Sequence, residues 1–275
     1  MKKALSVLIA FLICLSCGVT AFASTASDPS AADVGKEVAV TISEKTLGLT
    51  QADKEAYSTY GQDLVTKLSN YPVEDYDAVI EAFCKSNTNP VFDKVLNEIR
   101  VNKSNENIIR LKLSPALYEA YEEVYTIGND KTLTITPTYI VVSDLKTTDL
   151  GSELVGHARG TNSKWGICSE TYYGLLGNKL FSLAVECTFY YNGQKAWYKS
   201  GFDYYYTKGF LSIWQVSNWK GWKESSGTSY KAYCAGNFHF GLEYEGNGLV
   251  IQDFYCKNTL TCSKNGTISK YATHS

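Results

Sequence analysis

The sequence has few residues of the kinds that most enzymes use for catalysis. Its 275 residues include three histidines, His157, His239 and His274, and histidine is the side chain that most often acts as a general base near neutral pH. None of them belongs to a His-Glu-x-x-His motif, and the chain has no Gly-x-Ser-x-Gly or P-loop motif. We interpret the histidines as surface or structural residues, which favours a non-enzymatic protein.

Long apolar runs are missing after the N-terminus. Met1-Lys2-Lys3 precedes an apolar stretch from Ala4 to Ala21, and Ala21-Phe22-Ala23 has the small residues of a cleavage site. This order is typical of a secretory signal peptide, which we predict for residues 1–23. No later stretch approaches the roughly 20 apolar residues of a spanning helix, so we expect a secreted or extracellular protein.

Cys17 leaves a second interpretation of this leader open. It lies in Leu15-Ser16-Cys17-Gly18, where a lipid anchor could be attached. However, Cys14 stands where a lipoprotein signal usually has leucine, and the Ala-Phe-Ala site competes. Secretion is therefore favoured over lipid anchoring.

Tryptophan is absent from the first half of the chain. All five tryptophans follow residue 131, and the charge changes at the same place. Residues 24–130 have 18 acidic and 10 basic residues, a net charge of −8, whereas residues 131–275 have 10 acidic and 14 basic residues, a net charge of +4. We predict an acidic helical region over 24–130 and an aromatic-rich β-domain over 131–275. The acidic surface either docks on the basic half or is simply solvated.

Zinc-binding cysteine pairs are also missing, since no two cysteines have the Cys-x₂-Cys spacing. We therefore expect no metal and no cofactor. Six cysteines remain after the leader, which allow 15 disulfide connectivities in an exported protein; alternatively they are small apolar core residues. They are Cys84, Cys168, Cys187, Cys234, Cys256 and Cys262.

Apolar residues recur about every four positions in the first half. Thr50 is a good N-cap, and the pattern predicts helices that begin near Thr50, Tyr76, Pro90 and Ser114. The segment from Glu37 to Ile42 alternates like a short strand. Residues 108–113 also alternate, and their structure is left open.

From Leu133 the period changes to two, which is typical of strands. The clearest unit is a hairpin with strands at 181–191 and 194–199, joined by a two-residue type I′ turn at Asn192-Gly193. Gly246-Asn-Gly248 and Asn265-Gly266 predict further turns. The predicted fold is α+β, an acidic helical N-terminal region followed by an antiparallel β-sandwich.

Three motifs in this half are similar to those of a known group of proteins. They are Phe189-Tyr-Tyr-Asn-Gly193, Gly236-Asn-Phe-His-Phe240 and Gly246-Asn-Gly248. They resemble the C-terminal region of small secreted β-rich proteins of Gram-positive bacteria that have no assigned function. The resemblance covers roughly residues 172–271 and implies export and a β-rich body, without catalytic residues.

An aromatic and basic segment provides the candidate ligand-binding residues. Trp219-Lys-Gly-Trp222-Lys223 is too broken to predict a regular strand, so we expect a loop that displays its tryptophans for sugar stacking or membrane contact. The alternative is that both rings fold back to cap the sandwich. The candidate residues are Trp214, Trp219, Lys220, Trp222, Lys223 and Tyr205.

Two enzymatic alternatives rest on pairs of residues that the fold would have to bring together. Cys168 and His157 could form a thiol peptidase, although a buried or paired cysteine is the more usual case. A glycosidase needs two carboxylates about 5 to 10 Å apart. The carboxylates available in the β-half are Glu186, Asp203, Glu243 and Asp253.

Together these patterns favour a secreted bacterial, non-enzymatic binding protein that acts at the cell surface or outside the cell. The expected partner is a cell-wall glycan or a membrane surface. Nucleic acid is not expected, because the protein is exported and its net charge is −2. The alternative is a membrane-active, bacteriocin-like protein with residues 24–130 as a mask, and a hydrolase is the remote alternative.

Overall fold

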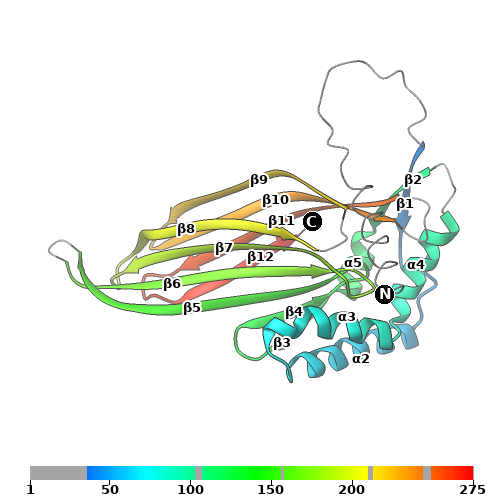
Figure 1. Ribbon diagram of the computed structural model, residues 1–275, viewed down its shortest axis with the longest axis horizontal. Helices are drawn as coiled ribbons and strands as arrows, with labels where there is room; N and C mark the ends of the chain where they lie inside the picture. The colour runs from blue at the N-terminus through cyan, green and yellow to red at the C-terminus, as the bar shows by residue number, and fades with distance from the viewer. Residues whose placement is uncertain (1–35, 103–106, 156–157, 210–212, 244–248, 275) are drawn as a thin grey trace, which may run out of the picture. The chain divides into compact units, whose positions relative to one another are not determined.

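Five helices and twelve strands make up the described part of the chain in a computed structural model (Figure 1). The structure describes residues 36–102, 107–155, 158–209, 213–243 and 249–274. The helices are α2 (Gln51–Leu68), the 3₁₀ helix η1 (Val73–Asp75), α3 (Tyr76–Ser86), α4 (Pro90–Asn102) and α5 (Pro115–Tyr121). The strands are β1 (Lys36–Ile42), β2 (Asn107–Leu113), β3 (Glu123–Ile127), β4 (Lys131–Ile135), β5 (Ile140–Val155), β6 (Ala158–Tyr173), β7 (Lys179–Tyr191), β8 (Ala196–Lys208), β9 (Ile213–Ser226), β10 (Ser229–Glu243), β11 (Leu249–Cys262) and β12 (Ile268–His274).

The predicted starts of the four α-helices are confirmed, and local caps explain where α2 and α5 begin. The Thr50 hydroxyl accepts a hydrogen bond from the Asp53 N–H at 3.2 Å, and the Asp53 carboxylate accepts one from the Thr50 N–H at 2.7 Å. This reciprocal pair satisfies two donors that the first turn of α2 would otherwise leave open. Ser114 caps α5 through a single bond, its hydroxyl accepting from the Leu117 N–H at 3.2 Å.

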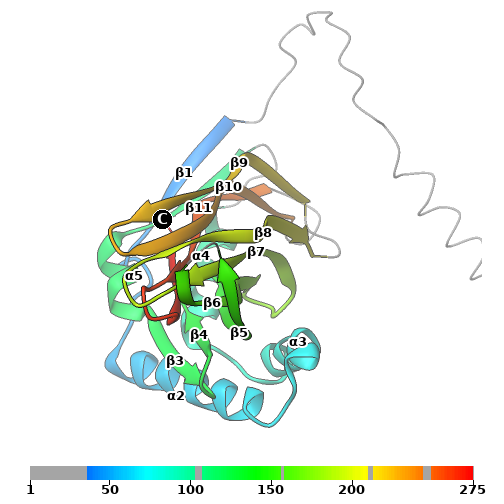
Figure 2. The same ribbon diagram turned by 90° about the vertical axis from the view of Figure 1, so that its left-hand side faces the viewer.

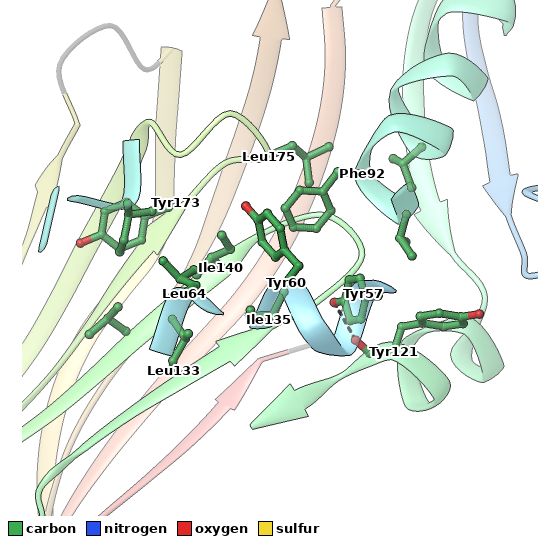
Figure 3. Close-up of a cluster of buried hydrophobic side chains, with 14 of the residues drawn as sticks. Tyr57, Tyr60, Leu64, Phe92, Tyr121, Leu133, Ile135, Ile140, Tyr173 and Leu175 are labelled. Atoms are coloured by element: carbon green, nitrogen blue, oxygen red, sulfur yellow. Dashed lines mark hydrogen bonds between the residues drawn. The ribbon is translucent and has the colours of Figure 1, made fainter. Parts of the chain in front are cut away.

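Helix α2 packs against β3 and against α3 and α4, and α4 also contacts β1 (Figures 1 and 2). The buried residues that these elements share form what we call the helical core. Tyr57 and Leu64 of α2 lie there with Leu133 of β4 (Figure 3). The Tyr57 hydroxyl donates to the Tyr121 carbonyl at 2.8 Å, which joins α2 to α5. The first half of the chain is therefore held to the second by a common core.

The described residues form two six-stranded sheets and are mostly β with some helix. Sheet A has the order β1-β2-β11-β10-β9, with β12 also paired to β11, and sheet B has the order β3-β4-β5-β6-β7-β8. Every neighbouring pair in sheet B is antiparallel. In sheet A, β9 to β12 also pair antiparallel, so the antiparallel prediction is confirmed for the strands that follow residue 131. The parallel pairs of this sheet, β1 with β2 and β2 with β11, involve strands of the first half of the chain.

Strands β1 and β2 show how the two halves are joined. Both come from the region predicted as helical, yet they extend the sheet of β9, β10 and β11. The segment left open by the sequence, near residues 108–113, is β2. The change of composition at residues 130 and 131 falls between the paired strands β3 and β4, in a hairpin turn instead of a linker.

The β7–β8 hairpin is confirmed, but its turn differs from the prediction. Tyr191 pairs directly with Ala196, so four residues form the connection instead of two. The Asn192 side chain accepts hydrogen bonds from the N–H groups of Gln194 and Lys195, each at 3.0 Å. Asparagine stabilises this wider turn by bonding the backbone ahead of it.

Residues of both sheets share a second buried cluster, the sheet core. Phe181 of β7 stacks on Phe238 of β10 with ring centroids 4.2 Å apart, and on its other side lies Tyr172 of β6 at 4.3 Å. The six cysteines of the described residues are free thiols, and five of them are buried in this core. The disulfide alternative is therefore wrong for this structure, and the strand cysteines act as small apolar core residues.

Candidate functional site

Aromatic, basic and polar side chains gather on the outer face of sheet A. By outer face we mean the side chains of β9 to β12 that point away from the sheet core. Ala232, Cys234 and Phe238 of β10 are buried in the sheet core. Because successive side chains of a strand alternate, Tyr233 and His239 lie on the opposite, outer face. Residues directly opposite them in β9 and β11 share that face.

The segment predicted as a loop is part of strand β9, so that prediction is wrong. Its glycines had made it look irregular, but packing explains them. A Cβ at Gly221 would collide with the Tyr204 ring, and one at Gly236 would lie 2.9 Å from the Trp219 ring. Glycine is therefore needed at both positions, because an aromatic ring lies directly against the strand backbone there.

Trp219 and Trp222 have opposite orientations. Trp219 packs against the sheet core, with its ring centroid 5.2 Å from Tyr206 and 6.0 Å from Phe238. The predicted exposure of Trp219 is therefore wrong, and its alternative, a ring that closes the core, is confirmed. Trp222 lies on the outer face, where it stacks on Tyr233 at 4.7 Å and 11°.

Lysines surround the Trp222–Tyr233 stack. The Lys220 ammonium lies 5.5 Å from the Trp222 ring centroid, and that of Lys257 lies 5.2 Å from Trp222 and 4.7 Å from Tyr233. Such contacts stabilise a cation over an aromatic ring. We call Lys220, Trp222, Tyr233 and Lys257 the aromatic–lysine cluster.

Glu224 anchors the tyrosine of this cluster. The Tyr233 hydroxyl donates to the Glu224 carboxylate at 2.6 Å. Tyr233 is only 5% exposed. Its burial, together with this carboxylate, raises the pKa of Tyr233 to about 12. The cluster therefore keeps a neutral phenol beside its two ammonium groups.

The other predicted binding residues lie elsewhere. Lys223 reaches across to β8, with its ammonium 4.6 Å from the Tyr198 ring and 4.8 Å from the Phe202 ring. Tyr205 is exposed on the outer face of sheet B. Trp214 belongs to β9, but its side chain lies outside the described residues. The fold therefore divides the single predicted aromatic site among three places.

Three polar residues meet on the outer face of sheet A beside this cluster. The Ser217 Oγ lies 2.9 Å from His239 Nε2, and His239 Nδ1 lies 2.8 Å from Asp253 Oδ1. The side chains of His239 and Asp253 are 39% and 40% exposed. We call these three residues the polar triad.

A β-bulge follows Ser217 directly. Ser217 pairs with Asn237 and Lys220 pairs with Ala235, which leaves Asn218 and Trp219 opposite Gly236 alone. Asn218 has φ +55°, the one positive φ of a non-glycine residue in the described chain. The extra residue reverses the alternation, so that Ser217 faces outward while Trp219 faces the core.

The predicted enzymatic pairs have different outcomes. Cys168 is buried, and burial raises the pKa of its thiol to about 12, so it is not an available nucleophile. His157, its proposed base, lies outside the described residues. Among the carboxylates, Glu186 and Asp203 lie directly opposite each other on sheet B, and the pKa of Glu186 is raised by burial and by Asp203.

The remaining two predicted carboxylates lie in sheet A. Asp253 contacts His239, while Glu243 is in β10 with its side chain outside the described residues. Ser217 was missed by sequence reasoning, since a serine in an aromatic segment carries no motif. Only the pairing of β9, β10 and β11 places it beside His239.

No helix in the described part of the chain is long and apolar enough to cross a membrane. No protein-family model matches the chain, and no curated protein or solved structure matches it. The resemblance to secreted proteins of Gram-positive bacteria therefore stays a prediction.

Proposed function

We propose that the protein is a secreted bacterial binding protein that recognises a cell-wall glycan through the aromatic–lysine cluster. The observation that carries this proposal is the Trp222–Tyr233 stack with Lys220 and Lys257 beside it. Aromatic side chains offer an apolar surface to the C–H groups of a sugar ring while keeping a polar edge in water. The two ammonium groups suit carboxylate or phosphate groups of an acidic glycan.

Two further proposals belong to this function. The leader over residues 1–23 would direct export, with secretion favoured over anchoring at Cys17. The sheets would form a β-sandwich, which the stack of Phe181 on Phe238 supports. In this arrangement the outer face of sheet A is the binding surface, and packing in the sheet core supports it.

The masking alternative has less support. Residues 24–130 supply β1, β2 and β3 to the two sheets and most of the helical core. Removing them would expose apolar surface of β4 and β5 instead of freeing a finished domain. We therefore do not develop the membrane-active function further.

Retention on an acidic wall polysaccharide tests the proposal. The mature protein should bind purified polysaccharide, and Trp222→Ala should weaken binding by about 10-fold or more, the scale of one lost aromatic contact. Added salt should weaken it further, because exposed ammonium groups are screened.

Trp197 provides a matched control on sheet B. Its ring lies 5.5 Å from Tyr190 and the Lys195 ammonium lies 5.7 Å from it, so it has similar neighbours on the other sheet. Trp197→Ala should bind like the wild type. Equal retention of the wild type and Trp222→Ala, or no retention at all, would contradict the proposal.

A further inference from the structure

We propose that the polar triad of Ser217, His239 and Asp253 is a hydrolytic site for short acyl esters, with Ser217 as the nucleophile. This activity goes beyond ligand binding and does not depend on it. It rests on hydrogen-bond geometry, on the exposure of the His239 and Asp253 side chains and on the bulge that follows Ser217.

The hydrogen bonds fix the state of the histidine. A carboxylate only accepts hydrogen bonds, so the contact of His239 Nδ1 with Asp253 Oδ1 at 2.8 Å places a proton on Nδ1. In the neutral ring, Nε2 then carries a lone pair. Nε2 lies 2.9 Å from Ser217 Oγ, so the hydroxyl can donate to it. In this arrangement the serine hydroxyl donates to a base, and a carboxylate orients that base. Such an arrangement activates a hydroxyl as a nucleophile.

Strand register explains how three distant residues meet. His239 lies directly opposite Asp253 in β11 and directly opposite Gln215 in β9. Ser217 is two residues further along β9, the diagonal neighbour of His239 on the same face, and such neighbours are within reach of a long side chain. The contacts therefore follow from regular pairing up to Ser217.

Stability alone gives little reason for this arrangement. Hydrogen bonds and ion pairs between side chains that are about 40% exposed contribute little to folding. The backbone beside Ser217 is also unusual, since Asn218 has φ +55° within a bulge. Bulges frequently aim side chains next to active sites, and positive φ values at non-glycine residues cluster at functional sites.

The reaction balances with water as the co-reactant. Ser217 Oγ attacks the ester carbonyl carbon, and His239 Nε2 accepts the hydroxyl proton. The bond between that carbon and the alcohol oxygen breaks, the alcohol leaves with the proton from His239, and the acyl group stays on Ser217. Water then attacks the acyl-serine, His239 takes a proton from it and returns a proton to Ser217, and the carboxylic acid leaves.

The position of Asn237 and the solvent exposure of the outer face of sheet A indicate which class of substrate the site would accept. Asn237 lies directly opposite Ser217, on the same face as His239, where its side-chain amide can donate to the oxygen that becomes negative in the reaction. The exposure of His239 and Asp253 leaves the site open to solvent. Such a site suits a small acyl group on the surface of a larger molecule.

Two measurements on the mature protein test this site. A fluorophosphonate probe should label the protein, and peptide mass spectrometry should locate the label on Ser217. Hydrolysis of p-nitrophenyl acetate should exceed that of Ser217→Ala, and His239→Ala should fall to the same level. Asp253→Asn should be on the order of 10-fold slower or more, because the Nδ1 proton loses its acceptor.

Controls separate this activity from general surface reactivity. Ser225→Ala removes an exposed serine of the same strand and should leave hydrolysis and labelling unchanged. Trp197→Ala, on sheet B, should also keep esterase activity. Far-UV circular dichroism confirms that each variant is folded. Labelling only at other residues, no labelling, or equal hydrolysis by the wild type and Ser217→Ala would overturn the proposal.

Discussion

Glu170→Gln should make the protein more stable at alkaline pH. Glu170 is buried in the sheet core, and its carboxyl accepts a hydrogen bond from the Tyr172 hydroxyl at 3.0 Å. Burial raises the pKa of Glu170 to about 7, although the Tyr172 hydrogen bond and the positive charge of Lys270 lower it in part. Glutamine has the same shape and keeps an acceptor for Tyr172, but it carries no charge, so it resembles the protonated acid.

The sign and size of the effect follow from proton linkage. The unfolded carboxyl releases its proton near its ordinary pKa of 4.5, whereas the folded one keeps it until about pH 7. Between these values the folded state binds more protons, so the free energy of unfolding falls as pH rises and levels off above about pH 7. The shift corresponds to about 3 kcal/mol at 1.4 kcal/mol per pKa unit. Glu170→Gln should thus match the wild type at pH 4 and exceed it by about 3 kcal/mol at pH 8.

Urea unfolding followed by tryptophan fluorescence, at steps between pH 4 and pH 8, measures this difference. Burial lowers the pKa of His274, so that residue removes stability as pH falls below about 6.5. It does so in both proteins, and its contribution cancels in the comparison. Glu74→Gln, at an exposed position in η1, is the control and should follow the wild-type curve.

Two results would refute the reasoning. Parallel stability curves for the wild type and Glu170→Gln would mean that Glu170 titrates near its ordinary pKa. A variant that is less stable than the wild type at pH 8 would mean that the carboxylate is ionised and paired with Lys270, and that the pair outweighs the cost of burial.

Three further predictions concern packing, capping and thiols. Trp219→Ala should lower the free energy of unfolding by about 2 to 4 kcal/mol because it leaves a cavity at the sheet core, whereas Trp222→Ala on the outer face should lower it by about 1 kcal/mol. Urea unfolding of the two variants measures these losses, and equal losses would contradict the opposite orientations of the two rings. Thr50→Ala should cost about 1 kcal/mol by removing the cap of α2, while Thr59→Ala, further along that helix, should cost less in the same assay. At pH 8 the native mature protein should react slowly with Ellman's reagent, since burial raises the pKa of Cys187 to about 12; denaturation should release six reactive thiols, and fewer than six would indicate a disulfide.

Local signals predicted much of the secondary structure because they act over a few residues. Thr50 and Ser114 cap their helices through contacts three residues away, and such caps are visible in any sequence. The β7–β8 hairpin was also predictable from its alternation and its Asn-Gly pair. Its turn type was not, because the Asn192 side chain bonds the backbone and widens the connection to four residues.

The candidate site was predicted only in part. Aromatic and lysine residues near position 220 marked the region, and Trp222 with Lys220 is found on the outer face of sheet A. Trp219 could not be assigned correctly, since the bulge at Asn218 reverses the alternation that assigns faces. Tyr233 and Lys257 complete the aromatic–lysine cluster from two other strands, and no spacing in the sequence links them.

The helix starts and their caps, the alternation of the β-strands and the aromatic character of the second half can be read from the sequence, because these depend on neighbours along the chain. Three features instead depend on the folded chain: β1 and β2 join the sheet of β11, five of the six described cysteines are buried as thiols, and Ser217 meets His239 and Asp253. The physical reason is strand register. A shift of one residue between β9 and β10 would turn Ser217 toward the core, and register is fixed by packing across the whole sheet.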